Sequence, residues 1–169
     1  MPSLTTLPEL QERLRRLPPG AVVGIEGCIG SGKSHLANEL RALLACRAIH
    51  TDECVAPGDE SLPYVDRLNY DQLRSSLCQP IVASVILVEG ICLRHVLSRI
   101  EVAPALFVYV KRIAESGLWH DGFHLEDYEA DNQNAAQEPQ RSDLHYHARE
   151  RPHERAELEV HRSEYPSAL

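Results

Sequence analysis

The chain has 169 residues, of which 43% are hydrophobic and 25% charged, and its formal net charge is −8. This length predicts a single domain over residues 1–169, and the hydrophobic content is sufficient for a sizeable core. The negative charge disfavours nucleic acid and anionic membrane surfaces as partners, and no apolar run is long enough to cross a bilayer.

The cysteines indicate the redox compartment. There are five, an odd number, and no two of them have C-x-x-C spacing. Reduced thiols are the plain interpretation, and together with the lack of a signal-peptide pattern they predict a cytoplasmic protein.

The first predicted element is a helix. Thr6-Leu-Pro-Glu9 is a capping box with proline in the first turn, and the helix should end near Leu17. Pro18-Pro-Gly20 stops it and leads into a strand. We therefore expect residues 1–20 to form an N-terminal helix and linker.

The next segment is the most specific motif of the chain. An apolar strand, Val22–Glu26, runs into G-x-x-x-x-G-K-S, and an amphipathic helix follows at Ser34–Leu44. The glycines let the backbone approach phosphate, and successive N–H groups form an anion-binding nest at the helix N-terminus. Lys33 would reach the β- and γ-phosphates of ATP, and the Ser34 hydroxyl would ligate Mg²⁺. The predicted nucleotide contacts are Gly27, Cys28, Ile29, Gly30, Ser31, Gly32, Lys33, Ser34 and His35.

Strands and helices alternate through the rest of the chain. The predicted strands are Ala48–Asp52, Val82–Glu89, Pro104–Val110 and, at the edge of the sheet, Leu158–His161. The predicted helices are Asp66–Leu77, the segment after Gly90, and much of the polar stretch 120–155. This pattern is typical of a five-stranded parallel sheet with helices on both faces, in which the P-loop, Asp52 and Glu89 meet at the carboxyl ends of the strands.

Two acidic residues at strand ends are candidates for metal binding and catalysis. Glu89 ends Val-Ile-Leu-Val-Glu-Gly, a Walker-B-like pattern, and is a predicted Mg²⁺ ligand; alternatively it caps the next helix. Asp52 is placed to accept a proton from an acceptor hydroxyl, as a general base. It could instead be a partner of the Mg²⁺ site or a turn-capping residue, and Glu53 is the neighbouring candidate for the base.

Basic side chains should neutralise the transferred phosphoryl group. Arg112, which follows the fourth strand beside Lys111, is the first candidate for a catalytic role. Residues 111–155 are predicted to act as a lid over the nucleotide, although each arginine there also fits a surface salt bridge. The lid candidates are Arg141, Arg149 and Arg151.

Nine histidines raise the question of a transition-metal site. His120 and His124 are four residues apart, and His145 and His147 are two apart. No cysteine or H-E-x-x-H pattern joins them, and charged residues surround them. They therefore predict a solvated polar face and no transition-metal site.

With these motifs in place, the chain resembles the uridine kinase and phosphoribulokinase-like group of P-loop kinases. The similar segments are the P-loop at 24–34, His-Thr-Asp at 50–52, the helix at 69–77, Val-Ile-Leu-Val-Glu-Gly-Ile at 85–91, and Tyr-His…Arg-Pro…Ala-Glu-Leu at 146–158. The resemblance implies a three-layer P-loop NTPase fold of the nucleoside-monophosphate-kinase type, ATP with Mg²⁺, and Asp52 as the base. It also implies that Tyr64, Arg67 and Asp71 contact the acceptor.

The chain lacks the insertion after Leu77 by which uridine kinases grip the base, and it lacks their R-x-x-R-D lid signature, so the acceptor is left open. The first hypothesis is transfer of the γ-phosphate to a small hydroxylated metabolite such as a nucleoside or sugar. The second is a nucleotide-binding or NTP-hydrolysing regulatory module that acts through a protein partner. A GTPase is disfavoured because no N-K-x-D motif follows the fourth strand, and a homodimer is kept open.

Overall fold

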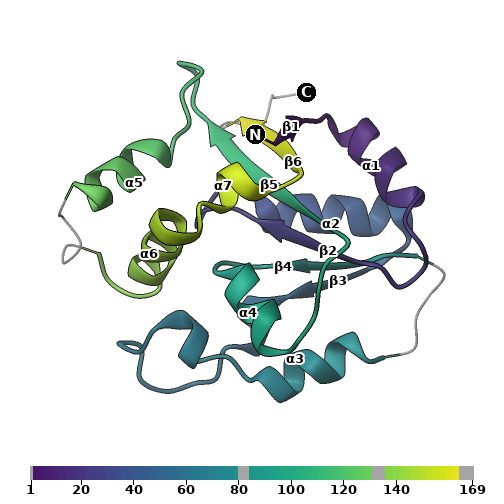
Figure 1. The fold of residues 1–169 in the computed structure, drawn as a ribbon, viewed down its shortest axis with the longest axis horizontal. Coiled ribbons are helices and arrows are strands. Elements are labelled where there is room, and N and C mark those ends of the chain that lie inside the picture. The colour runs from purple at the N-terminus through teal and green to yellow at the C-terminus, as the bar shows by residue number, and fades with distance from the viewer. Residues whose placement is uncertain (1, 80–83, 131–135, 164–169) are drawn as a thin grey trace.

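A parallel sheet of six strands runs through the molecule in this computed structural model, which describes residues 2–79, 84–130 and 136–163 (Figure 1). The strand order is β1-β6-β5-β2-β4-β3. The strands are β1 (Ser3–Leu4), β2 (Val22–Glu26), β3 (Arg47–His50), β4 (Ile86–Glu89), β5 (Leu106–Ile113) and β6 (Leu158–Ser163). The β2 strand lies at the centre, so the loop that follows it opens between its neighbours β4 and β5.

The prediction of five strands was wrong by one. The additional strand β1 has only two residues, and both side chains are exposed. It is therefore too short to show the alternation of apolar and polar residues by which a strand is predicted. It pairs in parallel with β6, where Ser3 lies opposite Leu158. Consequently β6 is an internal strand between β1 and β5, and the prediction that it forms the edge was also wrong.

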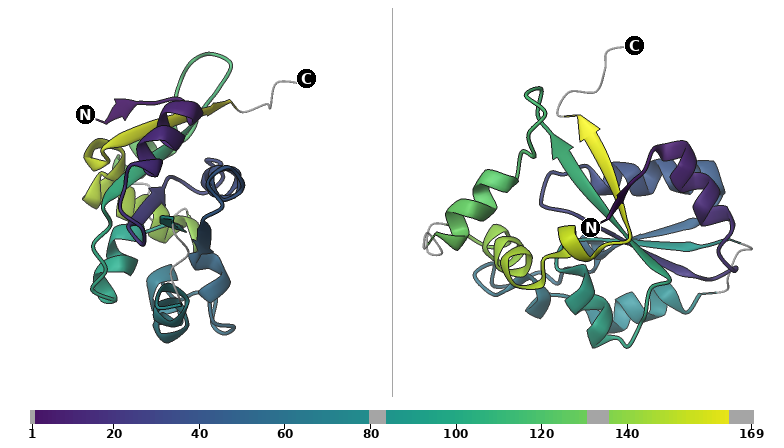
Figure 2. Two further views of the ribbon diagram at one scale, coloured as in Figure 1. Left: turned by 90° about the vertical axis from the view of Figure 1, so that its right-hand side faces the viewer. Right: turned by 45° about the horizontal axis from the view of Figure 1, so that its top comes forward.

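Helices cover both faces of the sheet (Figures 1 and 2). On one face lie α1 (Leu7–Arg15) and α2 (Lys33–Leu44), and on the other α3 (Tyr70–Leu77) and α4 (Leu93–Arg99). Figure 1 shows α5 (Gly122–Glu129) and α6 (Gln140–Glu150) grouped at the end toward which β2 and β4 point. A short helix, α7 (Pro152–Arg155), leads into β6.

The alternation of side chains along the strands divides the core into two clusters. In β4, Leu87 packs with α1 and α2, whereas Ile86 and Val88 pack with α3 and α4. All three side chains are buried, as expected for a parallel strand that is covered on both faces.

Several boundaries differ from the predicted ones. The strand predicted at Ala48–Asp52 ends at His50, and a 3₁₀ turn, Thr51–Cys54, follows it. The capping box of α1 is confirmed, since the Glu9 carboxylate accepts the Thr6 N–H at 2.8 Å. Part of the predicted strand at Val82–Glu89, residues 82 and 83, lies outside the described residues.

One helix begins later than predicted. The helix predicted from Asp66 begins at Tyr70, where the Asn69 side chain accepts the Gln72 N–H at 3.0 Å.

No helix in the described segments is long and apolar enough to span a membrane.

Candidate active site

The P-loop has the backbone that its glycines predict. Gly30 and Gly32 have φ angles of 79° and 92°, which other residues rarely adopt. A Cβ on Gly27 would lie 2.5 Å from Ser31 Oγ and 2.6 Å from the Val110 carbonyl oxygen. The loop is thus folded tightly against β5, and only glycine fits at this bend.

The two residues that follow Gly32 start α2. The Lys33 side chain is buried along the loop, and its Nζ donates to the Cys28 carbonyl at 3.3 Å. Ser34 is exposed in the first turn of α2, and the His35 side chain is exposed beside Glu39. A lysine bound to the loop and an exposed hydroxyl at the helix N-terminus suit phosphate and metal binding.

A cavity of about 320 Å³ opens on one side of the P-loop. Its wall includes Asp52, and Tyr64 Oη donates to Asp52 Oδ1 at 2.7 Å. The Thr51 hydroxyl lies 2.7 Å from the same phenol oxygen. Burial raises the pKa of Tyr64, so the phenol stays a neutral donor that fixes the carboxylate. The cavity is lined by Ile29, Gly30, Lys33, Ser34, Asp52, Val55, Tyr64, Arg67, Ile91 and Pro139.

The cavity separates the acceptor candidates. Arg67 and Tyr64 line it together with Asp52. Asp71 does not line this cavity: its side chain is 95% exposed and lies 3.6 Å from Arg74. The alternative base, Glu53, is exposed and also does not line this cavity, so the geometry favours Asp52.

Glu89 ends β4 with a buried carboxylate. One oxygen, Oε1, lies 2.6 Å from His50 Nδ1 on the adjacent strand. The other, Oε2, is buried and has no hydrogen-bond partner among the described residues. A carboxylate oxygen held in this way is suited to a divalent cation or its bound water. The alternative role as a helix cap does not describe this geometry, since α4 begins only at Leu93.

A second cavity, of about 310 Å³, lies on the other side of the loop and shares Gly30 with the first. Its lining residues are Gly30, Ser31, Gly32, His35, Arg112, Arg162 and Ser163. Arg112 Nη2 donates to His120 Nδ1 at 2.6 Å and lies 3.4 Å from Asp121 Oδ1. Arg162, which the sequence did not single out, forms an ion pair with Glu39 of α2.

The other predicted basic residues lie away from these cavities. Lys111 forms an ion pair with Glu159 at 2.8 Å. Of the lid candidates, Arg141 and Arg151 are exposed and lie near glutamates, and Arg149 is exposed. The predicted lid segment, residues 111–155, begins within β5 and ends after α6; residues 131–135 lie outside the described part.

One face of α6 is anchored in the interior. Tyr146 Oη donates to Glu26 Oε2 at 2.6 Å, and the Arg94 guanidinium contacts the same carboxylate at 2.8 Å. Burial raises the pKa of Glu26, and the charge of Arg94 opposes this shift. This network joins the end of β2 to α4 and α6 directly before the P-loop.

The prediction of a solvated face was wrong for His147. Its side chain is 1% exposed and lies under the P-loop together with Asp143, which is 2% exposed. Asp143 Oδ2 accepts the Ile29 N–H at 2.9 Å, so α6 supports the loop directly. The spacing of four between Asp143 and His147, which places both on one helix face, was the available signal.

The comparisons with known proteins bear on the fold. No family model matches the chain, and no curated protein matches it. Over 91% of its length it is similar to 96% of a solved structure described as a possible uridine kinase from Bacillus stearothermophilus, with a TM-score of 0.54 and 15% identity. A protein named as a fructose transport system kinase from a Silicibacter species gives a TM-score of 0.47 with 17% identity, covering 96% of this chain and all of that one. The first likeness shows that the chain has the parallel α/β fold of P-loop kinases.

Proposed function

We propose that the protein is an ATP-dependent kinase that transfers the γ-phosphate to a hydroxyl group of a small metabolite. The observation that carries the proposal is the pair of cavities that meet at Gly30 of the P-loop. One contains a carboxylate held by a buried phenol, and the other contains two arginines. A phosphotransferase needs such a division, with an acceptor and a base on one side of the phosphates and the nucleotide on the other.

The roles of the side chains follow from this division. Asp52 takes the proton of the acceptor hydroxyl, and Tyr64 holds the carboxylate in position. Arg67 lines the same cavity, and its guanidinium suits a substrate that carries oxygen atoms able to accept hydrogen bonds. Lys33 and Arg112 compensate the negative charge of the phosphates.

Mg²⁺ would be held by the Ser34 hydroxyl and by Glu89, whose free buried oxygen suits a direct or water-mediated contact. When bound, the ion neutralises phosphate charge. In the alternative assignment, the Asp52 carboxylate is a further partner of the Mg²⁺ site.

The second candidate function is a nucleotide-binding or hydrolysing module that acts through a protein partner. It requires the P-loop but gives no role to the Asp52–Tyr64 pair. The acceptor cavity therefore favours the kinase.

The deciding experiment uses Asp52→Asn, with Glu53→Gln as the matched control. If Asp52 is the base, ATP binds with near-normal affinity while acceptor-dependent turnover falls by about 10²–10⁴-fold. A role in the metal site predicts instead a joint loss of Mg²⁺-ATP affinity and rate, and a purely structural role predicts a lower melting temperature with little change in rate. Turnover that survives within a few-fold in Asp52→Asn would refute the assignment.

A further inference from the structure

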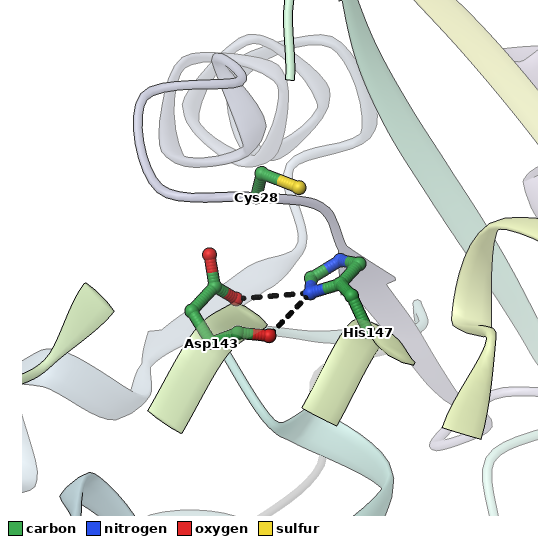
Figure 3. A group of neighbouring side chains, drawn as sticks. All are labelled: Cys28, Asp143 and His147. Carbon is green, nitrogen blue, oxygen red and sulfur yellow. Dashed lines mark hydrogen bonds and ion pairs between the residues drawn. The ribbon is translucent and has the colours of Figure 1, made fainter. Parts of the chain in front are cut away.

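A buried polar cluster lies directly beneath the P-loop. It consists of Cys28 from the loop and of Asp143 and His147 from α6 (Figure 3). The three side chains are 5%, 2% and 1% exposed. One ligand atom from each residue lies within 4.8 Å of the other two.

Two of these side chains present polar atoms without hydrogen-bond partners. Within the described residues, neither Asp143 Oδ1 nor His147 Nε2 forms a hydrogen bond, and both are buried. Oδ1 does lie 3.2 Å from His147 Nδ1, a contact that is an ion pair only when the imidazole is protonated. Burying such groups is costly unless they have a partner, so the cluster calls for one.

The remaining atoms of the cluster are already oriented as those of a metal site are. His147 Nδ1 donates to the Asp143 backbone carbonyl at 2.8 Å, which leaves the lone pair on Nε2. Asp143 Oδ2 accepts the Ile29 N–H, which leaves Oδ1 free of hydrogen bonds. Figure 3 shows the Cys28 sulfur above the imidazole, on the side that carries Nε2.

We propose that Cys28, Asp143 and His147 form a binding site for a divalent transition metal, with Zn²⁺ the ion that fits best. Thiolate, imidazole and carboxylate are all common zinc ligands, whereas Mg²⁺ selects oxygen alone. The ligand atoms of tetrahedral zinc lie roughly 3.3–3.8 Å apart, so the side chains need to contract only slightly. A fourth position remains, and the Tyr109 hydroxyl lies 3.5 Å from the Cys28 sulfur.

The bound ion would join α6 to the phosphate-binding loop. The Cys28 carbonyl accepts a hydrogen bond from Lys33 Nζ, so the residue whose sulfur would bind the metal also contacts the lysine of the loop. Zinc would thereby fix the loop and the helix that supports it in one arrangement. This inference does not depend on the proposed kinase activity, because it concerns side chains beneath the loop.

The alternative without a metal is a thiol–imidazole–carboxylate cluster. Burial lowers the pKa of His147, but its electrostatic and hydrogen-bond interactions with Cys28 and Asp143 outweigh this and raise it well above its ordinary value. In such a cluster a protonated His147 would interact with the Asp143 carboxylate and the Cys28 sulfur, and no metal ion would be needed. Titration with a spectroscopic metal distinguishes the two.

The test is titration of the metal-free, full-length protein with Co²⁺ in the absence of nucleotide, followed by displacement with Zn²⁺. We expect one equivalent of Co²⁺ to produce sulfur-to-cobalt charge-transfer absorption and the visible bands of tetrahedral cobalt. Cys28→Ser should abolish the charge-transfer band, and His147→Gln or Asp143→Asn should weaken binding by more than about 100-fold. Cys78→Ser, which changes an exposed cysteine, should leave the spectrum unchanged.

Circular dichroism of each variant confirms that it is folded, and the Asp143→Asn amide can still accept the Ile29 N–H. Zn²⁺ should also raise the melting temperature of the wild type and not that of His147→Gln. Absence of the charge-transfer band in the wild type at excess Co²⁺ would overturn the proposal in favour of the metal-free cluster. Loss of the band in Cys78→Ser but not in Cys28→Ser would overturn it as well.

Discussion

The buried carboxylate of Glu26 allows a quantitative prediction for Arg94→Met. Glu26 is 1% exposed, and the Arg94 guanidinium contacts its Oε1 through Nη2 at 2.8 Å and Nε at 2.9 Å. Methionine keeps the apolar contact with Phe107 but removes the charge that lies 3.8 Å above that ring. The carboxylate then keeps only the Tyr146 hydroxyl as a hydrogen-bond donor among its side-chain partners in the described structure.

Breaking a buried ion pair from one side typically costs about 3–5 kcal/mol. Losing the cation–π contact adds about 0.5–1 kcal/mol. For a chain of this size, 1 kcal/mol corresponds to a shift in melting temperature of about 2–4 °C, so Arg94→Met should melt at least about 7 °C lower. The double variant Arg94→Met/Glu26→Gln removes the unpaired charge and should recover most of the loss.

The loss should depend on pH. Burial raises the pKa of Glu26 in the folded protein, so the native state keeps this proton at a higher pH than the unfolded chain does. Stability linked to the proton is complete below the unfolded pKa of about 4.3 and is lost as pH rises through the folded value. Without Arg94 the folded pKa rises further, so the defect should shrink on acidification.

The assay is urea unfolding at neutral pH and at a pH near the unfolded carboxyl value, with the wild type and the double variant in parallel. The wild type and the single variant should differ by several kcal/mol at neutral pH and by less at acid pH. A loss below about 1 kcal/mol at neutral pH would refute the reasoning, as would a double variant that is no more stable than Arg94→Met.

The remaining predictions concern the proposed Mg²⁺ ligands and the second cavity. Ser34→Ala and Glu89→Gln should each raise the Mg²⁺ concentration needed for nucleotide binding, measured by calorimetry at fixed ATP; a wild-type Mg²⁺ titration in both variants would place the metal elsewhere. Arg112→Gln should lower the turnover rate by about 10³-fold with a smaller effect on ATP affinity, because guanidinium charge acts mainly in the transition state. Arg162→Gln should instead weaken ATP binding, and Arg16→Gln, at the exposed residue that caps the C-terminus of α1, serves as the control for both. Equal kinetics in all three arginine variants would contradict the assignment of the second cavity to the nucleotide.

The central part of the fold was predictable because its signals are local. The strand Val22–Glu26 has the predicted bounds, since a short apolar run followed by a glycine-rich loop is compatible with little else. The end of β4 at Glu89 was also correct, because Gly90 is required there: a Cβ would lie 1.8 Å from Thr51 Oγ1. Asp52 lines the cavity as expected, although it lies in the turn after β3 and not at the end of the strand itself.

The features that were missed depend on contacts between distant parts of the chain. Strand β1 is defined by its parallel pairing with β6, which lies at the other end of the described chain. Asp143 and His147 lie in a polar segment that looks solvated until α6 is docked beneath the P-loop. Arg162 lines the second cavity because β6 pairs in parallel with β5. No local sequence pattern predicts which strand lies beside β5.

The most direct test of the account is phosphoryl transfer itself. Wild type and Lys33→Ala are incubated with Mg²⁺-ATP and pools of hydroxylated metabolites, and both ADP and phosphorylated products are detected by mass spectrometry. The account predicts that the wild type forms ADP in step with one phosphorylated small molecule, and that Lys33→Ala, although folded, binds ATP more weakly and forms neither product at a comparable rate. ATP hydrolysis that proceeds equally with and without every acceptor, or transfer that is unchanged in Lys33→Ala, would contradict it.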